Sequence, residues 1–143
     1  MSYLIPAEFV TKMVDAGESK IYMAPRDVLI RAYMAGAILA LAAVFAVTIT
    51  VQTGSALVGA ILFPVGFCML YLMGFDLLTG VFVLTPLALI DKRPGVTLGG
   101  VLKNWGLVFI GNFCAASSSA SLAMFIGTPS ISNMIRPGFT TAA

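Results

Sequence analysis

The stretch GFDLLTG, residues 74–80, interrupts a long apolar part of this chain and decides how that part can fold. No charged residue occurs from Ala32 to Phe75 or from Leu77 to Ile90, so Asp76 is an isolated acid between two apolar runs. A carboxylate in such a place is costly unless it lines a cavity, caps a helix end or is buried in protein. The stretch is therefore a candidate functional site.

The composition indicates an all-α integral membrane protein. Of the 143 residues, 59% are hydrophobic and 10% are charged, whereas a soluble domain carries about 25% charged residues. A membrane span needs about 20 mostly apolar residues, more than the apolar core of a secretory signal contains. We predict a membrane domain over residues 26–127 with spans at about 28–51, 56–90 and 101–126, followed by a tail at 128–143 without clear structure.

Several functions are disfavoured by what the sequence lacks. It has no histidine, which argues against b-type haem ligation and removes the commonest metal ligand, so we expect no metal and no cofactor. Cys68 and Cys114 lie in apolar runs, where packing is favoured over a disulfide or a metal pair. The net charge is +2 without a basic patch, so nucleic acid is not an expected partner. The sequence offers no pair of a nucleophile and a base, so enzymatic activity is not expected.

Residues 1–25 are predicted to contain an amphipathic helix that starts near Pro6, because proline suits the first helical turn. One side carries apolar residues and another carries charged ones; these are Phe9, Met13, Val14 and Ala16 against Glu8, Lys12, Asp15 and Glu18. Without a polybasic face, packing on the cytoplasmic ends of the spans is favoured over a membrane-binding or partner-binding role.

The second apolar segment is interpreted as one helix broken at residues 74–80, because residues 81–90 are too short to span a membrane alone. A break at membrane depth frees backbone groups, which must face protein or a watery cavity. The half-helix that begins near Thr79 would direct its positive end and its free N–H groups at that cavity. Small anions are therefore the expected ligands.

The positions of the basic residues predict the orientation of the chain. Seven of the eight lysines and arginines precede the first span or flank the entry to the third, and Arg136 lies alone on the other side. By the positive-inside rule, the N-terminus and the turn at Asp91 are expected in the cytoplasm.

Four pieces of the sequence, in this order, match a known family: Pro6-Ala7-Glu8, the first span around Gly36, residues 74–79, and Lys103-Asn104-Trp105 followed by Gly111-Asn112. On these residues the chain resembles the first half of the formate/nitrite transporter family of pentameric channels. The resemblance implies an aquaporin-like inverted-repeat fold in a bacterial inner membrane, of which this chain supplies one three-span repeat. It also implies a small monovalent anion as partner, with or without a proton, and a homo-oligomer or a complementary second half.

The resemblance implies roles for the residues of the path. Thr79 corresponds to a pore threonine thought to act in gating, and Leu78 lies beside it at the cytoplasmic constriction. Phe63 and Phe67 fall at or near positions where the family narrows the path, and ordinary core packing is the alternative.

Other residues are expected to shape or support the path. Gly74, Asp76 and Gly80 shape the loop, and we expect Asp76 to accept hydrogen bonds from the N–H of Leu78 or Thr79 as an N-cap rather than to relay protons. Of four further residues near the third span, Lys103 is expected to snorkel, Asn104 to cap or bond another helix, Trp105 to anchor at the interface, and Asn112 to bridge helices.

Two features depart from the family. Its members are about twice as long, with a second repeat that carries a pore histidine. After Phe113 this chain reads CAASSSAS, residues 114–121, and we expect the resemblance to end there. Serines can bond back to the carbonyl four residues earlier, so a helix is still possible. We expect a channel or transporter for small anions that forms half of a transport unit, or else a truncated or frameshifted half-subunit without transport.

Overall fold

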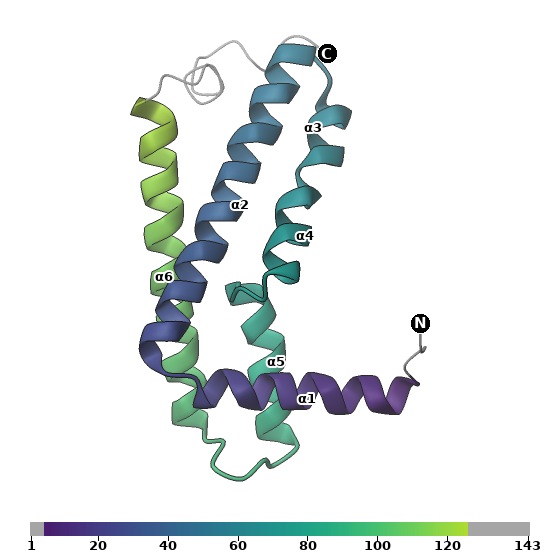
Figure 1. Cartoon of the computed structure of the whole chain (residues 1–143), viewed down its shortest axis with the longest axis vertical. Helices are drawn as coiled ribbons and strands as arrows, with labels where there is room; N and C mark the ends of the chain where they lie inside the picture. Colours follow the sequence, from purple (N-terminus) through teal and green to yellow (C-terminus); the bar gives the residue numbers. More distant parts are fainter. Residues whose placement is uncertain (1–4, 126–143) are drawn as a thin grey trace.

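The computed structural model describes residues 5–125, which form six helices joined by turns (Figure 1). These are α1 (Pro6–Tyr22), α2 (Pro25–Thr53), α3 (Ala56–Leu62), α4 (Pro64–Leu72), α5 (Leu78–Ile90) and α6 (Leu98–Phe125). The predicted all-α class is confirmed over this part of the chain. The expected tail at 128–143, Arg136 and the end of the predicted third span lie outside the described residues.

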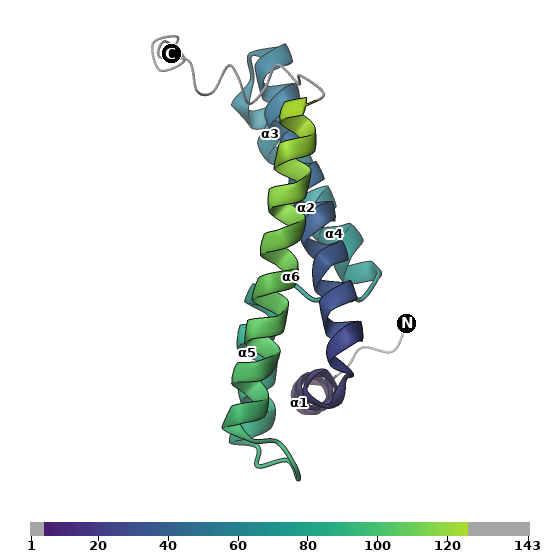
Figure 2. The same ribbon diagram turned by 90° about the vertical axis from the view of Figure 1, so that its left-hand side faces the viewer.

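Two helices are long and apolar enough to cross a membrane. They cover Pro25–Thr53 and Leu98–Ala123, and they contain most of the predicted first and third spans. Proline begins α2, and Gly54 ends it in the left-handed conformation with φ 66°, which glycine adopts without strain. The two helices run side by side in the same direction (Figures 1 and 2).

Small residues allow α2 and α6 to approach closely. A Cβ atom added to Gly36 would lie 2.6 Å from the carbonyl oxygen of Asn112, and one added to Gly111 would lie 2.6 Å from the Cβ of Ala32. Ala32 and Ala115 are completely buried. Without bulky side chains between the backbones, polar groups of one helix can reach those of the other.

The chain between the two long helices returns in three shorter pieces, α3, α4 and α5, which run antiparallel to α2 (Figure 1). Pro64 lacks an N–H and separates α3 from α4, an interruption that the sequence interpretation did not include. Residues 73–77 separate α4 from α5. The non-helical stretch is thus shorter than the predicted 74–80, and Thr79 and Gly80 belong to the first turn of α5.

Helix α1 lies across α5, and in Figure 2 α1 is seen along its own axis. The two backbones touch at Gly17, whose added Cβ would lie 1.9 Å from the carbonyl oxygen of Leu84. Val14 is buried in the same contact region, while Phe9, nearer the free end of α1, remains 52% exposed. The helix therefore packs on the rest of the structure, chiefly on α5, through its second half only.

The serine-rich stretch remains helical within α6. The hydroxyl of Ser118 donates to the carbonyl of Cys114 at 2.8 Å, and that of Ser121 donates to the carbonyl of Ser117 at 2.9 Å. These bonds satisfy the hydroxyls within their own helix. Cys114 and Cys68 are free and exposed. The sequence interpretation had favoured packing for both, and the structure does not bury either of them.

Candidate functional site

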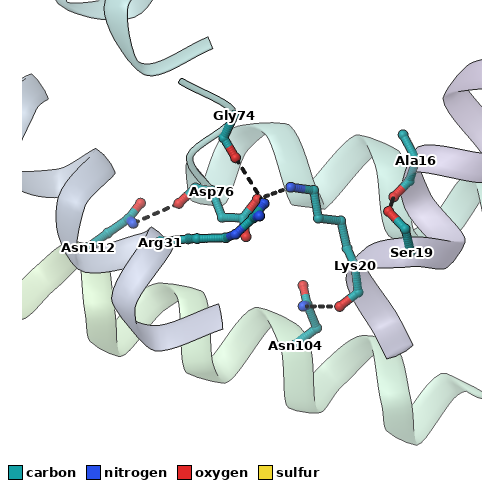
Figure 3. Close-up of polar contacts among 8 residues, drawn as sticks. All are labelled: Ala16, Ser19, Lys20, Arg31, Gly74, Asp76, Asn104 and Asn112. Atoms are coloured by element: carbon teal, nitrogen blue, oxygen red, sulfur yellow. Dashed lines mark hydrogen bonds and ion pairs between the residues drawn. The ribbon is translucent and has the colours of Figure 1, made fainter. Parts of the chain in front are cut away.

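The break between α4 and α5 is organised around Asp76, which is only 2% exposed. Its Oδ1 atom forms an ion pair with the ammonium of Lys20 on α1, as Figure 3 shows. The expected N-cap bonds from Leu78 or Thr79 to this carboxylate are not formed, and the N-cap position of α5 is Leu77, which makes no side-chain cap bond. A buried carboxylate gains more from a cation than from neutral N–H groups, which explains the difference.

The Lys20–Asp76 ion pair has little other support. The side chain of Lys20 is 15% exposed, and Oδ2 of Asp76 is buried without a partner among the described residues. Leaving a buried polar atom unpaired is costly, so Lys20 provides the main compensation for the burial of this carboxylate.

Two further contacts hold the backbone of Lys20 and of the break. Arg31 of α2 donates from Nη1 to the carbonyl of Gly74 at 3.3 Å, and Gly74 itself has a positive φ of 69°. Asn104, which is 4% exposed on α6, donates from Nδ2 to the carbonyl of Lys20 at 3.0 Å. That carbonyl lies in the last turn of α1, where helical partners are absent. Asn104 therefore bonds another helix, one of the two roles expected for it.

Asn112 joins three parts of the structure. Its Oδ1 accepts the N–H of Leu78 at 3.1 Å, and its Nδ2 donates to the carbonyl of Ala32 at 2.8 Å. The same Nδ2 donates to the carbonyl of Asp76 at 3.1 Å, the contact that Figure 3 shows. It thus bridges α6 to α2, as a helix-bridging residue would, and it also caps α5. The cap across 34 residues was not expected.

Thr79 and Leu78 differ in their surroundings although they are neighbours. Leu78 packs against the buried cluster of Val28, Ala32, Val81 and Val108. Thr79 is exposed, and within residues 5–125 neither its hydroxyl nor its N–H has a hydrogen-bond partner. Two free donors therefore lie together at the positive end of α5.

A small cavity of about 120 Å³ lies beside the break. Its lining includes Lys20, Tyr71, Gly74, Asp76, Gly80 and Leu84. A volume of this size holds a few water molecules or one small ion.

The remaining predicted residues occupy three different settings. Phe63 and Phe67 contact each other edge to face, with ring centroids 5.4 Å apart, and both are half-buried. The indole N–H of Trp105 lies 2.9 Å from Oγ1 of Thr85 and 3.2 Å from the carbonyl of Val81, so Trp105 fastens α6 to α5. Lys103 is exposed.

The sequence interpretation missed Lys20, Arg31 and Thr85 as partners of the site. Nothing in the local pattern separates Lys20 from Lys12, which points to solvent from the same helix. A hydroxyl side chain in the middle of the apolar helix α5 was the available signal for Thr85.

Arg93 ties the second half of α1 to the turn after α5. Its guanidinium lies 2.8 Å from a carboxylate oxygen of Asp15 and 3.6 Å from one of Glu18, and it bonds Asp91 at 2.9 Å. The hydrogen bond to Asp91, with the charges of Asp15 and Glu18, raises the pKa of Arg93 above its ordinary value.

Comparison with known proteins finds one family model and several relatives that resemble this chain. A family model described as formate/nitrite transporter matches residues 7–142. The formate channel FocA of Escherichia coli (strain K12) is 33% identical over 120 residues, which are 79% of this chain and 41% of FocA. The uncharacterized transporter YrhG of Bacillus subtilis (strain 168) is 28% identical over 122 residues, 81% of this chain and 45% of YrhG.

These matches correct one expectation and set one boundary. The family match continues well past Phe113, so the expected end of the resemblance there is wrong. The chain spans less than half the length of these relatives. No solved structure shows significant similarity to it.

Proposed function

This chain belongs to the formate/nitrite transporter family, and from that premise we propose that it forms part of a membrane pathway for small monovalent anions such as formate or nitrite. The formate channels among its relatives support this class of ligand. Its two long apolar helices suit a membrane protein. We place the N-terminus and the Asp91 turn in the cytoplasm of a bacterial cell, because the basic residues gather there.

The observation that carries the proposal is the pair of unpartnered donors on Thr79. A helix N-terminus carries a partial positive charge, and its free N–H groups bind anions. The Thr79 hydroxyl adds a second donor to the same spot. An anion that reaches the break would therefore exchange some of its water for these two groups.

The neighbouring apolar residues would narrow the path. Leu78 would form the cytoplasmic constriction, and the contacting rings of Phe63 and Phe67 would form a second one. Moving a bare anion through an apolar constriction is costly, so passage as the neutral acid is favoured. Gly74, Asp76 and Gly80 would keep the loop in shape, with Lys20 and Arg31 holding it from α1 and α2.

We further propose that these three spans act as one repeat of an aquaporin-like inverted-repeat fold. The second span would be the broken series α3, α4 and α5, in which each piece alone is too short to cross. A complementary repeat or further copies of this chain would close the path around Thr79. The competing candidate is a structural half-subunit that transports nothing itself.

Anion flux into proteoliposomes tests the proposal. We expect formate to enter vesicles that contain this chain, and we expect Thr79→Ala to lower the flux at least about tenfold, the effect of removing one donor from a charged ligand. Thr79→Ser should retain most of the flux because it keeps the hydroxyl. Thr53→Ala is the matched control, because Thr53 is a threonine at the C-terminal end of α2, away from the break.

If the unmodified chain gives no flux, a second experiment, co-reconstitution, separates the two candidates. If co-reconstitution with the second half of a family member restores flux that depends on Thr79, the chain is half of a transport unit. If no combination transports formate, the anion pathway is rejected and the structural half-subunit is the correct description.

A further inference from the structure

The amide of Asn112 can sit in only one orientation. The Leu78 N–H is a donor, whereas the carbonyls of Ala32 and Asp76 are acceptors. Oδ1 must therefore face Leu78 and Nδ2 must face the two carbonyls, because a flipped amide would lose all three hydrogen bonds. An aspartate could not donate to the carbonyls, and a leucine could do neither.

The packing of α2 on α6 gives this amide its reach. The Ala32 carbonyl is the helical acceptor for the N–H of Gly36 four residues later, and a carbonyl has a second lone pair for Asn112. Gly36 also makes room for the backbone of Asn112, since an added Cβ would lie 2.9 Å from the Asn112 Cα. The close contact between α2 and α6 therefore places the side-chain amide of Asn112, on α6, beside the start of α5.

Asn112 divides the first N–H groups of α5 into occupied and free ones. Gly80 and Val81 donate to the Leu77 carbonyl at 3.0 and 3.1 Å. Asn112 occupies the Leu78 N–H, so Thr79 alone among these four residues retains an open N–H in the part of the chain that the structure describes. The free N–H is the one that shares its residue with a free hydroxyl.

We propose that Asn112 is a positioning residue that withholds the Leu78 N–H from the ion and thereby makes Thr79 the sole backbone donor of the anion site. The inference rests on the proposed function, because it assigns a supporting residue to that site. Asn112 acts through the backbone of α5 and does not itself touch the anion.

Amide NMR of the full-length chain in lipid nanodiscs, with formate as the probe, tests this. In the unmodified chain we expect the Leu78 amide to exchange with solvent at least about tenfold more slowly than the Thr79 amide. Formate should shift the Thr79 amide resonance and leave that of Leu78 unchanged. This comparison needs no variant, so it stands even if substitution of Asn112 prevents folding.

The variant Asn112→Ala sharpens the test. Its Leu78 amide should exchange about tenfold faster, and formate should now shift both amide resonances because two donors are open. Simple destabilisation would not add a second responding amide. The fluorescence of Trp105, the single tryptophan, reports whether the variant is folded, and Ser118→Ala on the same helix is the matched control.

The outcomes separate the two proposals. If Thr79 responds to formate in the unmodified chain but Asn112→Ala gives the same single response, the role of Asn112 is overturned and the anion site stands. If Leu78 responds in the unmodified chain, the role of Asn112 is also overturned. If neither amide responds at any formate concentration, the anion site at Thr79 fails, and the positioning role fails with it.

Discussion

The ammonium of Lys20 and the carboxylate of Asp76 form an ion pair across 56 residues of sequence, and this pair joins the amphipathic helix α1 to the break between α4 and α5. Asp76 is the one buried charged side chain among the residues that the structure describes. The shape of the break therefore depends on a helix more than 50 residues away in the sequence.

Removing the cation should destabilise the protein strongly. In Lys20→Met the buried carboxylate keeps its position but loses its charge partner, and breaking a buried pair in this way costs about 3–5 kcal/mol. Asp76→Asn should cost less, because the stem of Lys20 can bend and bring its ammonium to solvent. Unfolding in a denaturing detergent series would measure both losses.

The control for this prediction is Lys12→Met, at an exposed position of the same helix, which should change the unfolding free energy by less than about 0.5 kcal/mol. Equal losses for Lys20→Met and Lys12→Met would contradict the importance of the pair.

Two glycines on neighbouring helices should respond oppositely to alanine. Gly36→Ala places a Cβ 2.6 Å from a backbone oxygen of α6, so the helices must separate at a cost of roughly 1–3 kcal/mol. In Gly106→Ala on α6 the added Cβ has no neighbouring atom within 4 Å. Alanine in a helix interior is more stable than glycine by about 0.5–1 kcal/mol. Thermal unfolding should show a lower midpoint for Gly36→Ala and an equal or higher one for Gly106→Ala; any other order would argue against the α2–α6 contact.

The bond from Trp105 to Thr85 should be measurable as a coupling. Trp105→Phe removes the indole donor, and Thr85→Val removes its acceptor; each change should cost about 1–2 kcal/mol. Because both remove the same bond, the double variant should lose about 0.5–1.5 kcal/mol less than the sum of the two. Trp105 also contacts the ring of Phe82 edge to face, with centroids 4.6 Å apart. Strictly additive losses in a double-mutant cycle would show that Trp105 acts through such apolar packing and not through its hydrogen bond to Thr85.

Salt, but not alkali, should loosen α1 from the turn after α5. The pKa of Arg93 is raised above its ordinary value by the hydrogen bond to Asp91 and the nearby carboxylates, so its charge contributes fully below the ordinary arginine pKa and is lost only as the pH rises through the raised one. Raising the pH from about 7 to about 10 should thus leave amide exchange in α1 unchanged as far as Arg93 is concerned. High salt screens this exposed contact, and Arg93→Gln should remove the salt effect.

Lys92→Gln, in the same turn but without an ion pair among the described residues, is the control for this last experiment. Retention of the full salt effect in Arg93→Gln would show that other charges hold α1.

Much of the architecture could be read from local patterns. The amphipathic run after Pro6, the long apolar run that ends at Gly54 and the break around Gly74 all lie close to their predicted places. Such features follow from residues within a few positions of one another, because helix formation, proline and glycine act on neighbouring backbone groups. The interruption at Pro64 was also within reach, since a proline inside a helix removes an N–H.

The partners within the site were decided by tertiary structure. The sequence by itself determined that an isolated acid, a threonine and a half-helix would lie together at residues 76–79. The close packing at Gly36 and Gly111 brings Asn112 to the half-helix, and for this reason Asn112 and not Asp76 caps it. The crossing of α1 over α5 brings Lys20 within reach of Asp76. The physical reason is that backbone propensity is local, whereas a buried polar group takes whichever partner the packing of distant helices brings within reach.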